Sequence, residues 1–286
     1  MRVISGLLLA LSACVVASAP VEAQNEAQFS AGSEYRIDQF TYRFENPSSF
    51  DQGLVPHFFR QHYDSDSPWL LLRVAYRPEA RRWTTEVAVT PEVVTYGDDY
   101  DTFYQSDGDV VTSGTRGNVS LRSWRLDHRM TTFTSKQLRV YVGYGYRRDR
   151  ARFHEGYKTV IHTRPPSLEE SIVTTRETTT SDVHEVRVGI EGTVTPGTWR
   201  LTWRTEASPV TTGRLTVWLP DKYPDRVIRF WAPTFGAAAS VGAARVVNGM
   251  LLSLQLGASR TWSYRTAASL QREAITVAAS VGWPAR

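Results

Sequence analysis

Apolar and polar residues alternate along the C-terminal segment of the chain, residues 250–283. Every second residue from Leu252 to Ala258 is apolar, and the residues between them are small or polar. Residues 274–283 repeat the pattern, with an apolar residue at every odd position. A period of two is typical of a β-strand with one apolar face. The segment therefore predicts two strands, each with one face that meets either a core or lipid.

The same period, read together with turn residues, predicts ten strands. They cover residues 34–44, 69–76, 82–104, 110–129, 138–163, 171–194, 198–219, 226–246, 250–264 and 271–283. Beyond the N-terminus, no segment has the roughly 18 consecutive apolar residues of a membrane-spanning helix. Strands with one apolar face can still cross a bilayer when they close into a barrel.

The connections between these strands alternate between short and long. The short ones are residues 77–81, 130–137, 195–197 and 247–249, and the last contains Asn-Gly, which favours a two-residue hairpin turn. The long ones carry Pro, Gly and charge, with tips expected at residues 106–109, 165–170 and 220–225. Periplasmic turns and extracellular loops alternate in this way. The sequence predicts an all-β fold, a ten-stranded antiparallel transmembrane β-barrel with tall extracellular hairpins.

The N-terminal segment has the pattern of a secretory signal peptide. An apolar run follows Arg2, and Val21-Glu22-Ala23 forms a cleavage pattern before Gln24. We predict a signal peptide at residues 1–23, an N-terminal periplasmic lead at 24–33 and an outer-membrane barrel at 34–286. The predicted location is the cell outer membrane, reached through a cleaved signal peptide. Leu11-Ser12-Ala13-Cys14 also fits a lipoprotein box, which would place a lipid on Cys14.

Composition narrows the possible chemistry. Cys14 is the only cysteine, so a chain cleaved after Ala23 has no disulfide and no thiolate site. The formal net charge of +4 is too small to indicate a nucleic-acid partner. The histidines show no metal-ligand spacing, and we expect neither a metal nor a cofactor. Arginine outnumbers lysine, and its bidentate pairing with carboxylate and phosphate indicates lumen ion pairs or lipid phosphates as partners.

In each predicted strand, odd- and even-numbered residues face opposite sides of the barrel wall. This parity places several ionisable residues in the lumen, on the side opposite the apolar face. They are Arg73, Glu86, Glu92, Arg139, Arg147, Glu185, Arg187, Glu191, Arg200, Arg204 and Glu206. Opposite charges on facing strands of a narrow barrel favour a packed, structural lumen over a conduction path.

Two short acidic motifs lie in the predicted hairpins. Asp99-Tyr100-Asp101 lies on the second hairpin, and Asp182-Val183-His184 lies on the descending arm of the third. With the ten strands and tall hairpins, they make the chain resemble the omptins, outer-membrane aspartyl-type proteases of Gram-negative bacteria. The resemblance implies that an Asp-His pair polarises a water while facing carboxylates hold it or share a proton. It points to Asp99, Asp101, Asp182 and His184 as catalytic residues.

The position and parity of the motifs depart from that family. The family's Asp-x-His pair lies on the fourth hairpin, here residues 207–231, which contains no His. The Asp-Val-His motif has the parity of Val186, which is assigned to lipid. The Asp-Tyr-Asp motif has the parity of Val89, also assigned to lipid, unless a bulge at Gly97 reverses it. Solvated carboxylates and a surface histidine are the competing interpretation.

Four arginines lie at the point where the predicted fifth strand leaves the membrane, namely Arg147, Arg148, Arg150 and Arg152. Lipopolysaccharide presents phosphates at that height, and the last three continue the lipid-facing parity of Val142. We predict that this group binds lipid phosphate, with lipopolysaccharide as the partner. A solvated outer rim is the alternative.

Three functions remain open on the sequence. The leading hypothesis is an outer-membrane barrel whose surface hairpins contact lipopolysaccharide or external macromolecules, in an interaction or structural role and not an enzymatic one. The alternative is an omptin-type endopeptidase with a displaced site. The third is a small-solute pore.

Overall fold

The computed structural model describes residues 26–45, 58–77, 82–105, 107–135, 138–218, 220, 227–264 and 268–284. The strands are β1 (Glu26–Glu45), β2 (Phe58–Arg77), β3 (Trp83–Val89), β4 (Val93–Tyr104), β5 (Val110–Thr134), β6 (Leu138–Thr163), β7 (Pro166–Thr174), β8 (Thr178–Val194), β9 (Trp199–Trp218), β10 (Val227–Val247), β11 (Met250–Ser263) and β12 (Ala268–Pro284). Within these ranges, no helix is long and apolar enough to span a membrane. The expected signal peptide, Cys14 and most of the 220–225 tip lie outside the described residues.

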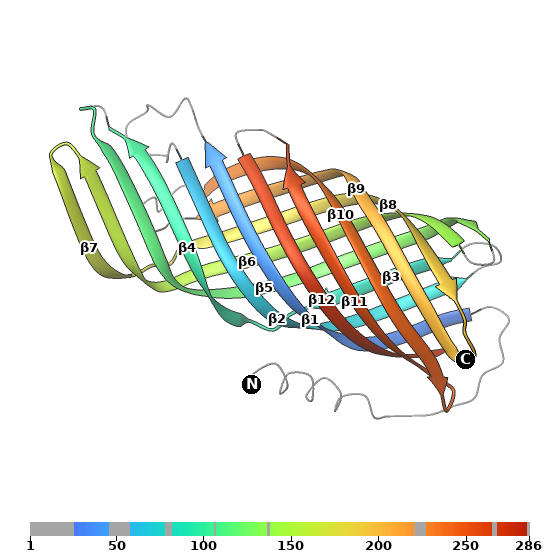
Figure 1. Ribbon diagram of the computed structural model, residues 1–286. Coiled ribbons are helices and arrows are strands. Elements are labelled where there is room, and N and C mark those ends of the chain that lie inside the picture. The colour runs from blue at the N-terminus through green and yellow to red at the C-terminus, as the bar shows by residue number, and fades with distance from the viewer. Residues whose placement is uncertain are drawn as a thin grey trace.

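The strands form one closed antiparallel ring (Figure 1). Pairing of β1 with β12, from Gln28–Pro284 to Phe44–Ala268, closes it. β3 and β4 share one place in the ring between β2 and β5, and β7 and β8 both pair with β6. The twelve strands therefore make a barrel of ten, and the predicted fold class is confirmed.

β1 and β2 begin well before the positions that the sequence pattern predicted. β1 begins at Glu26, so residues 26–33, expected as a periplasmic lead, pair with β12 and β2 as part of the barrel. β2 begins at Phe58, although only residues 69–76 were predicted as strand. In its upper half, outward residues such as Arg60 and Asp64 are polar, so no apolar outer face marks this part of the strand.

The outward side chains form an apolar belt around the barrel. Its exposed aliphatic members include Leu70, Leu72, Val74, Val186, Val188, Val241, Leu252, Leu254, Leu256 and Ile275. Aromatic side chains lie at both edges, with Tyr76, Trp199 and Trp283 at the short-turn edge and Tyr144 and Tyr264 at the long-hairpin edge. Apolar bands flanked by aromatic girdles are typical of barrels embedded in lipid.

The tallest part of the molecule is the sheet of β5, β6 and β7, which rises at one side (Figure 1). Asp109 fixes its tip, because its carboxylate accepts hydrogen bonds from the amides of Thr163 and Arg164, both at 2.8 Å. The same carboxylate lies 2.8 Å from Nδ1 of His162. These hydrogen bonds, above all that of His162, lower the pKa of Asp109.

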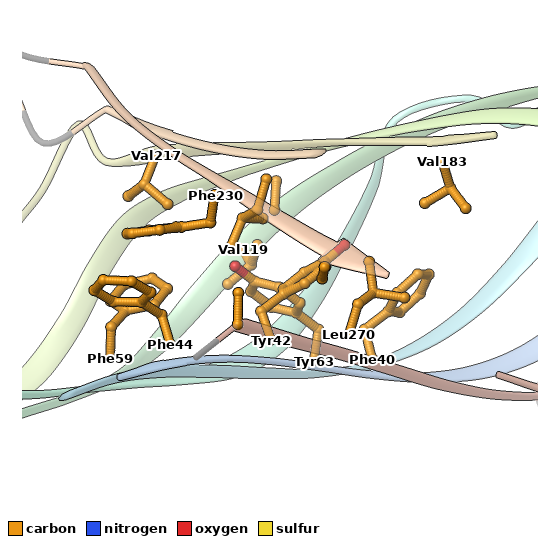
Figure 2. Close-up of a cluster of buried hydrophobic side chains, with 14 of the residues drawn as sticks. Phe40, Tyr42, Phe44, Phe59, Tyr63, Val119, Val183, Val217, Phe230 and Leu270 are labelled. Atoms are coloured by element: carbon orange, nitrogen blue, oxygen red, sulfur yellow. The ribbon is translucent and has the colours of Figure 1, made fainter. Parts of the chain in front are cut away.

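An apolar layer fills the lumen at the long-hairpin end. It consists of Phe40, Tyr42, Phe44, Phe59, Tyr63, Val119, Leu121, Ala151, Phe153, Val183, Leu215, Val217, Phe230, Ala232, Ala268 and Leu270. Phe44 of β1 stacks on Phe230 of β10 with ring centroids 3.7 Å apart. Figure 2 shows side chains from two walls of the barrel meeting in this layer, with Phe44 and Phe59 below Phe230 and Val217. The lumen is therefore closed by packing at this height.

Arginines and carboxylates fill the middle of the lumen. Asp38, 1% exposed, accepts hydrogen bonds from Arg36 at 2.7 Å, Arg272 at 2.8 Å and Arg147 at 3.4 Å. Further ion pairs join Arg125 to Glu34 and Glu86, Arg187 to Asp127 and Glu185, and Arg139 to Glu191. The facing wall of β10, β11 and β12 contributes small residues such as Gly257, which leave space for these side chains. The charges predicted for the lumen lie there, with the exception of Glu92.

We expect Leu254→Arg to destabilise the barrel in lipid vesicles by about 2–4 kcal/mol, because an exposed belt position would place a charge in hydrocarbon. Denaturant titration of the vesicle-embedded protein measures the difference. Leu254→Ala is the matched control and should cost much less. Equal free energies of unfolding for the two variants would contradict the assignment of this face to lipid.

We expect Asp38→Asn to cost about 3–5 kcal/mol, because it leaves three guanidinium groups without their shared buried carboxylate. The denaturant midpoint and the temperature of heat-modifiable gel migration report the loss. Asp64→Asn is the control, since that side chain is 66% exposed and should contribute less than about 1 kcal/mol. A midpoint for Asp38→Asn no lower than that of the control would show that the lumen pairs contribute little.

Candidate functional site

Outward-facing arginines gather just above the apolar belt. Arg148, Arg150 and Arg152 alternate along the outer face of β6 and are all exposed, in keeping with the parity of Val142. Arg147 lies on the other side of the wall. Its guanidinium binds Asp149 at 2.8 Å in the lumen and lies over the rings of Phe40 and Trp69. The outer group therefore does not include Arg147.

Two further arginines from neighbouring strands join this outer group. Arg122 of β5 lies directly opposite Arg150 in the β5–β6 ladder. Arg214 of β9 lies opposite Asp182, which lies opposite Arg148. We call Arg122, Arg148, Arg150, Arg152 and Arg214 the outer arginine cluster. The sequence alone did not identify Arg122 and Arg214, because cross-strand register decides which residues become neighbours.

Positive charge in the outer arginine cluster is only partly compensated. Arg122 approaches Glu92 at 3.6 Å, and Arg148 approaches Asp182 at 3.6 Å. Within the described ranges, Arg150 and Arg152 form no ion pair with a carboxylate. Like charges directly opposite each other destabilise a ladder, so an anion between Arg122 and Arg150 would relieve the repulsion.

Asp182 and His184 lie on the outer face of β8, as their parity predicted. Asp182 accepts hydrogen bonds from the Tyr146 hydroxyl at 2.6 Å and from Arg214 at 2.9 Å. Burial acts to raise the pKa of Asp182, but these hydrogen bonds and the charge of Arg148 lower it overall. His184 is exposed, and its Nδ1 lies 2.6 Å from the Tyr144 hydroxyl. Asp182 thus holds two arginines of the outer cluster in place.

Asp99 and Asp101 point into the lumen. Their exposed fractions are 5% and 0%, and they lie opposite Gln61 and Phe59 in the β2–β4 ladder. The barrel wall therefore separates them from Asp182 and His184. The four residues to which the omptin resemblance points do not share one cleft in this structure.

A register shift between β3 and β4 explains the inward direction of Asp99 and Asp101. Val89 pairs with Trp124, whereas Val93 pairs with Leu121. The chain thus advances four residues from β3 to β4 while β5 advances only three. One extra residue reverses the parity of everything that follows. The sequence allowed such a reversal at Gly97, but it occurs at residues 90–92. Glu92 is consequently turned outward and does not line the lumen.

The residues around the break make the shift possible. Pro91 has no amide hydrogen to contribute to a ladder. Thr90 turns inward, and its hydroxyl donates to the carbonyl oxygen of Pro68 at 2.8 Å. A side-chain hydrogen bond to a neighbouring strand therefore holds the chain in place where the strand is interrupted.

The lumen side of the fourth hairpin is apolar where it enters the apolar layer. Leu215 and Val217 of β9 and Phe230 and Ala232 of β10 are all at most 9% exposed. None of these side chains can take or give a proton. Beside this layer, Gln61 of β2 donates to Glu177 and accepts a hydrogen bond from Thr179 at 2.7 Å, which links two walls of the barrel.

Glu177 and Gln61 were not among the residues that the sequence singled out. Glu177 lies in the break between β7 and β8, and Gln61 lies in a segment expected to be a connection. Within the part of the chain that the structure describes, no group of three or more His, Cys, Asp or Glu residues could hold a metal ion.

Comparison with known proteins supports the fold and no finer conclusion. Neither a family model nor a curated protein matches the chain. The outer-membrane protease OmpT from Escherichia coli aligns over 95% of this chain and 99% of its own, with a TM-score of 0.69 and 10% identity. The translocator domain of the autotransporter NalP from Neisseria meningitidis aligns over 88% of both chains, with a TM-score of 0.35 and 8% identity. The chain thus has the fold of an outer-membrane β-barrel and is similar in architecture to an omptin.

Proposed function

We propose that this protein is exported by a cleaved signal peptide to the cell outer membrane, where the outer arginine cluster binds lipopolysaccharide phosphates. The proposed role is interaction or structural, not enzymatic. The observation that carries the proposal is the position of Arg150 and Arg152, which face outward directly above the belt without a carboxylate partner in the described structure. A protein surface at this height meets the phosphate layer of the outer leaflet.

The geometry of the cluster suits a phosphate group. Arg122 and Arg150 project from directly opposite positions, so their guanidinium groups can approach one anion from two sides. Arginine donates two parallel hydrogen bonds to phosphate and stays charged at any physiological pH. Below them, Trp124 and Tyr146 pack with ring centroids 4.8 Å apart. Aromatic residues favour the boundary between hydrocarbon and headgroups, which supports a position of the arginines at headgroup height.

The omptin-type endopeptidase remains the second candidate because of two observations. The fold is similar to that of OmpT, and Asp99 and Asp101 are carboxylates directed to the interior of the hairpin region. The position of Asp182 and His184 on the outer face argues against a shared site. A small-solute pore has less support, because the apolar layer and the ion pairs occupy the lumen.

We expect the double variant Arg150→Gln, Arg152→Gln to lose most of the lipopolysaccharide that copurifies with the barrel. A hydrogen bond to a charged group contributes roughly 1.5–3 kcal/mol, so each arginine should account for about tenfold or more in affinity. Lipopolysaccharide per barrel is measured by acyl-chain and phosphate analysis after purification in mild detergent.

Arg116→Gln provides the matched control for this experiment. Arg116 also projects outward from β5, but it lies higher on the hairpin and pairs with Asp98 at 3.1 Å. Its loss should leave the lipopolysaccharide content unchanged. An unchanged content in the double variant, with heat-modifiable migration intact, would reject the proposed lipid site.

We expect no specific cleavage when the folded barrel is mixed with basic peptides in the presence of lipopolysaccharide. His184→Ala and Asp99→Asn should therefore behave as the unsubstituted protein does, because the two motifs lie on opposite sides of the wall. Mass spectrometry of the peptides is the measurement. Cleavage that disappears in both variants would favour the endopeptidase and would require the two motifs to meet in another conformation.

A further inference from the structure

A cavity at the short-turn end of the lumen carries an excess of positive charge. Its volume is about 170 Å³, and residues of β1, β2, β3, β5, β6, β8, β9, β10 and β11, together with Arg82 before β3, line it. Six arginines line this cavity, against one carboxylate, that of Glu191. The arginines are Arg73, Arg82, Arg129, Arg139, Arg200 and Arg204. We call this space the arginine cavity.

The next cavity along the lumen has a different charge balance. Its volume is about 150 Å³, and its lining has nine arginines and five carboxylates, most of which are joined in ion pairs. Beyond it lies the apolar layer. Arg73, Arg129 and Arg204 line both cavities. Of the residues that line only one, the arginine cavity has three arginines and one carboxylate, and the next cavity has six arginines and five carboxylates. The positive excess therefore rises toward the short-turn end, and the apolar layer closes the lumen in the other direction. An anion drawn into the arginine cavity would enter from the short-turn end.

Three arginines of the cavity have carboxylate partners. Arg139 binds Glu191 at 3.0 Å, Arg204 approaches Glu206 at 3.9 Å, and Arg73 forms an ion pair with Glu86. These pairs do not include Arg82 or Arg129.

Arg82 and Arg129 form no ion pair with any carboxylate in the described part of the chain. Nε of Arg129 is buried and makes no hydrogen bond there. The guanidinium of Arg129 lies 5.9 Å from the centre of the Tyr141 ring, which directs it into the cavity beside that ring. A guanidinium away from bulk water is costly unless it is paired and hydrogen-bonded. The cavity thus offers donors and positive charge without matching acceptors.

The lining of the cavity indicates the class of anion. Guanidinium groups match the oxygens of phosphate in two parallel hydrogen bonds. Thr84 and Thr131 also line the space, and their hydroxyl groups can donate to further oxygens. A cavity of about 150 Å³ in another protein holds one benzene, so the arginine cavity has room for a small oxyanion such as phosphate.

We propose that the arginine cavity is a binding site for a small phosphate-class oxyanion that enters from the short-turn end of the barrel. Arg82 and Arg129 are its principal ligands, and the arginines that are already paired with carboxylates add to the positive electrostatic potential around the anion. The site is separate from the outer arginine cluster, because the barrel wall lies between them. It does not depend on the proposed lipopolysaccharide contact.

Calorimetric titration of the full detergent-solubilised barrel with inorganic phosphate tests the proposal. We expect saturable binding of one phosphate per barrel, and affinity about tenfold lower in Arg82→Gln and in Arg129→Gln. Arg116→Gln, which changes an outward arginine that is paired with Asp98 at 3.1 Å and lies outside both arginine groups, is the matched control and should bind phosphate as the unsubstituted barrel does. Loss of phosphate binding in Arg150→Gln alone would place the anion on the outer face and overturn the proposal.

A chloride titration at the same ionic strength separates binding from screening of charge. Equal heats of binding for chloride and phosphate, or a phosphate titration that does not saturate, would overturn the proposal. This test needs only the unsubstituted protein. Glycerol phosphate in a further titration distinguishes a free anion from the phosphate of a larger molecule. Binding of both compounds, lost in Arg82→Gln, supports a phosphate-class site open to monoesters, whereas binding of phosphate alone supports a closed site for the free anion.

The variants can be judged only in folded barrels. Arg82 precedes β3 and lies outside the strand ladders, so Arg82→Gln is the variant expected to keep heat-modifiable migration. Arg82→Lys keeps the charge but loses the paired donors. Affinity between those of Arg82→Gln and the unsubstituted barrel is expected for it, and an affinity equal to that of the unsubstituted barrel would overturn the assignment of Arg82 as a bidentate ligand.

Discussion

Closure of the ring between β1 and β12 is the constraint on which the rest of the structure depends. Hydrocarbon offers no hydrogen-bond partners to a backbone, so strands that face lipid must satisfy one another around a closed circle. Once the ring is closed, each side chain has only two directions available, toward lipid or solvent and toward the lumen. Parity along each strand then decides the environment of nearly every residue, and only a bulge can change it.

The number of strands could be predicted from the sequence because lipid marks one face of each strand. The prediction was weaker where lipid is absent. In the upper half of β2, polar residues such as His62 alternate with inward residues such as Phe59, and hydropathy alone does not distinguish this from a surface connection. The register shift at residues 90–92 was missed because one extra residue leaves no periodic trace, although Pro91 in a predicted strand is a recognised sign of interruption.

In the candidate site too, the sequence predicted which face of a strand a residue occupies but not which residues of other strands lie beside it. Arg148, Arg150 and Arg152 could be assigned to the outer face because β6 pairs with β8 without a shift from Val142 to Arg152. Their neighbours Arg122 and Arg214 could not be assigned, because that step requires the alignment of separate strands. The lumen charges were identified by parity, but their partners depend on which walls face each other.

Parity also separates two populations of arginine that the composition of the chain does not distinguish. Arg147 and Arg148 are adjacent in sequence, yet one binds Asp149 in the lumen and the other approaches Asp182 on the outside. Their surroundings differ in what can neutralise them. On the outer face, an anion of the membrane surface can reach the guanidinium groups, whereas in the lumen the charge must be met by internal carboxylates or by an anion that enters from the short-turn end. Because the internal carboxylates are concentrated in the middle of the lumen, Arg82, near the short turns, has no ion-paired carboxylate in the described part of the chain.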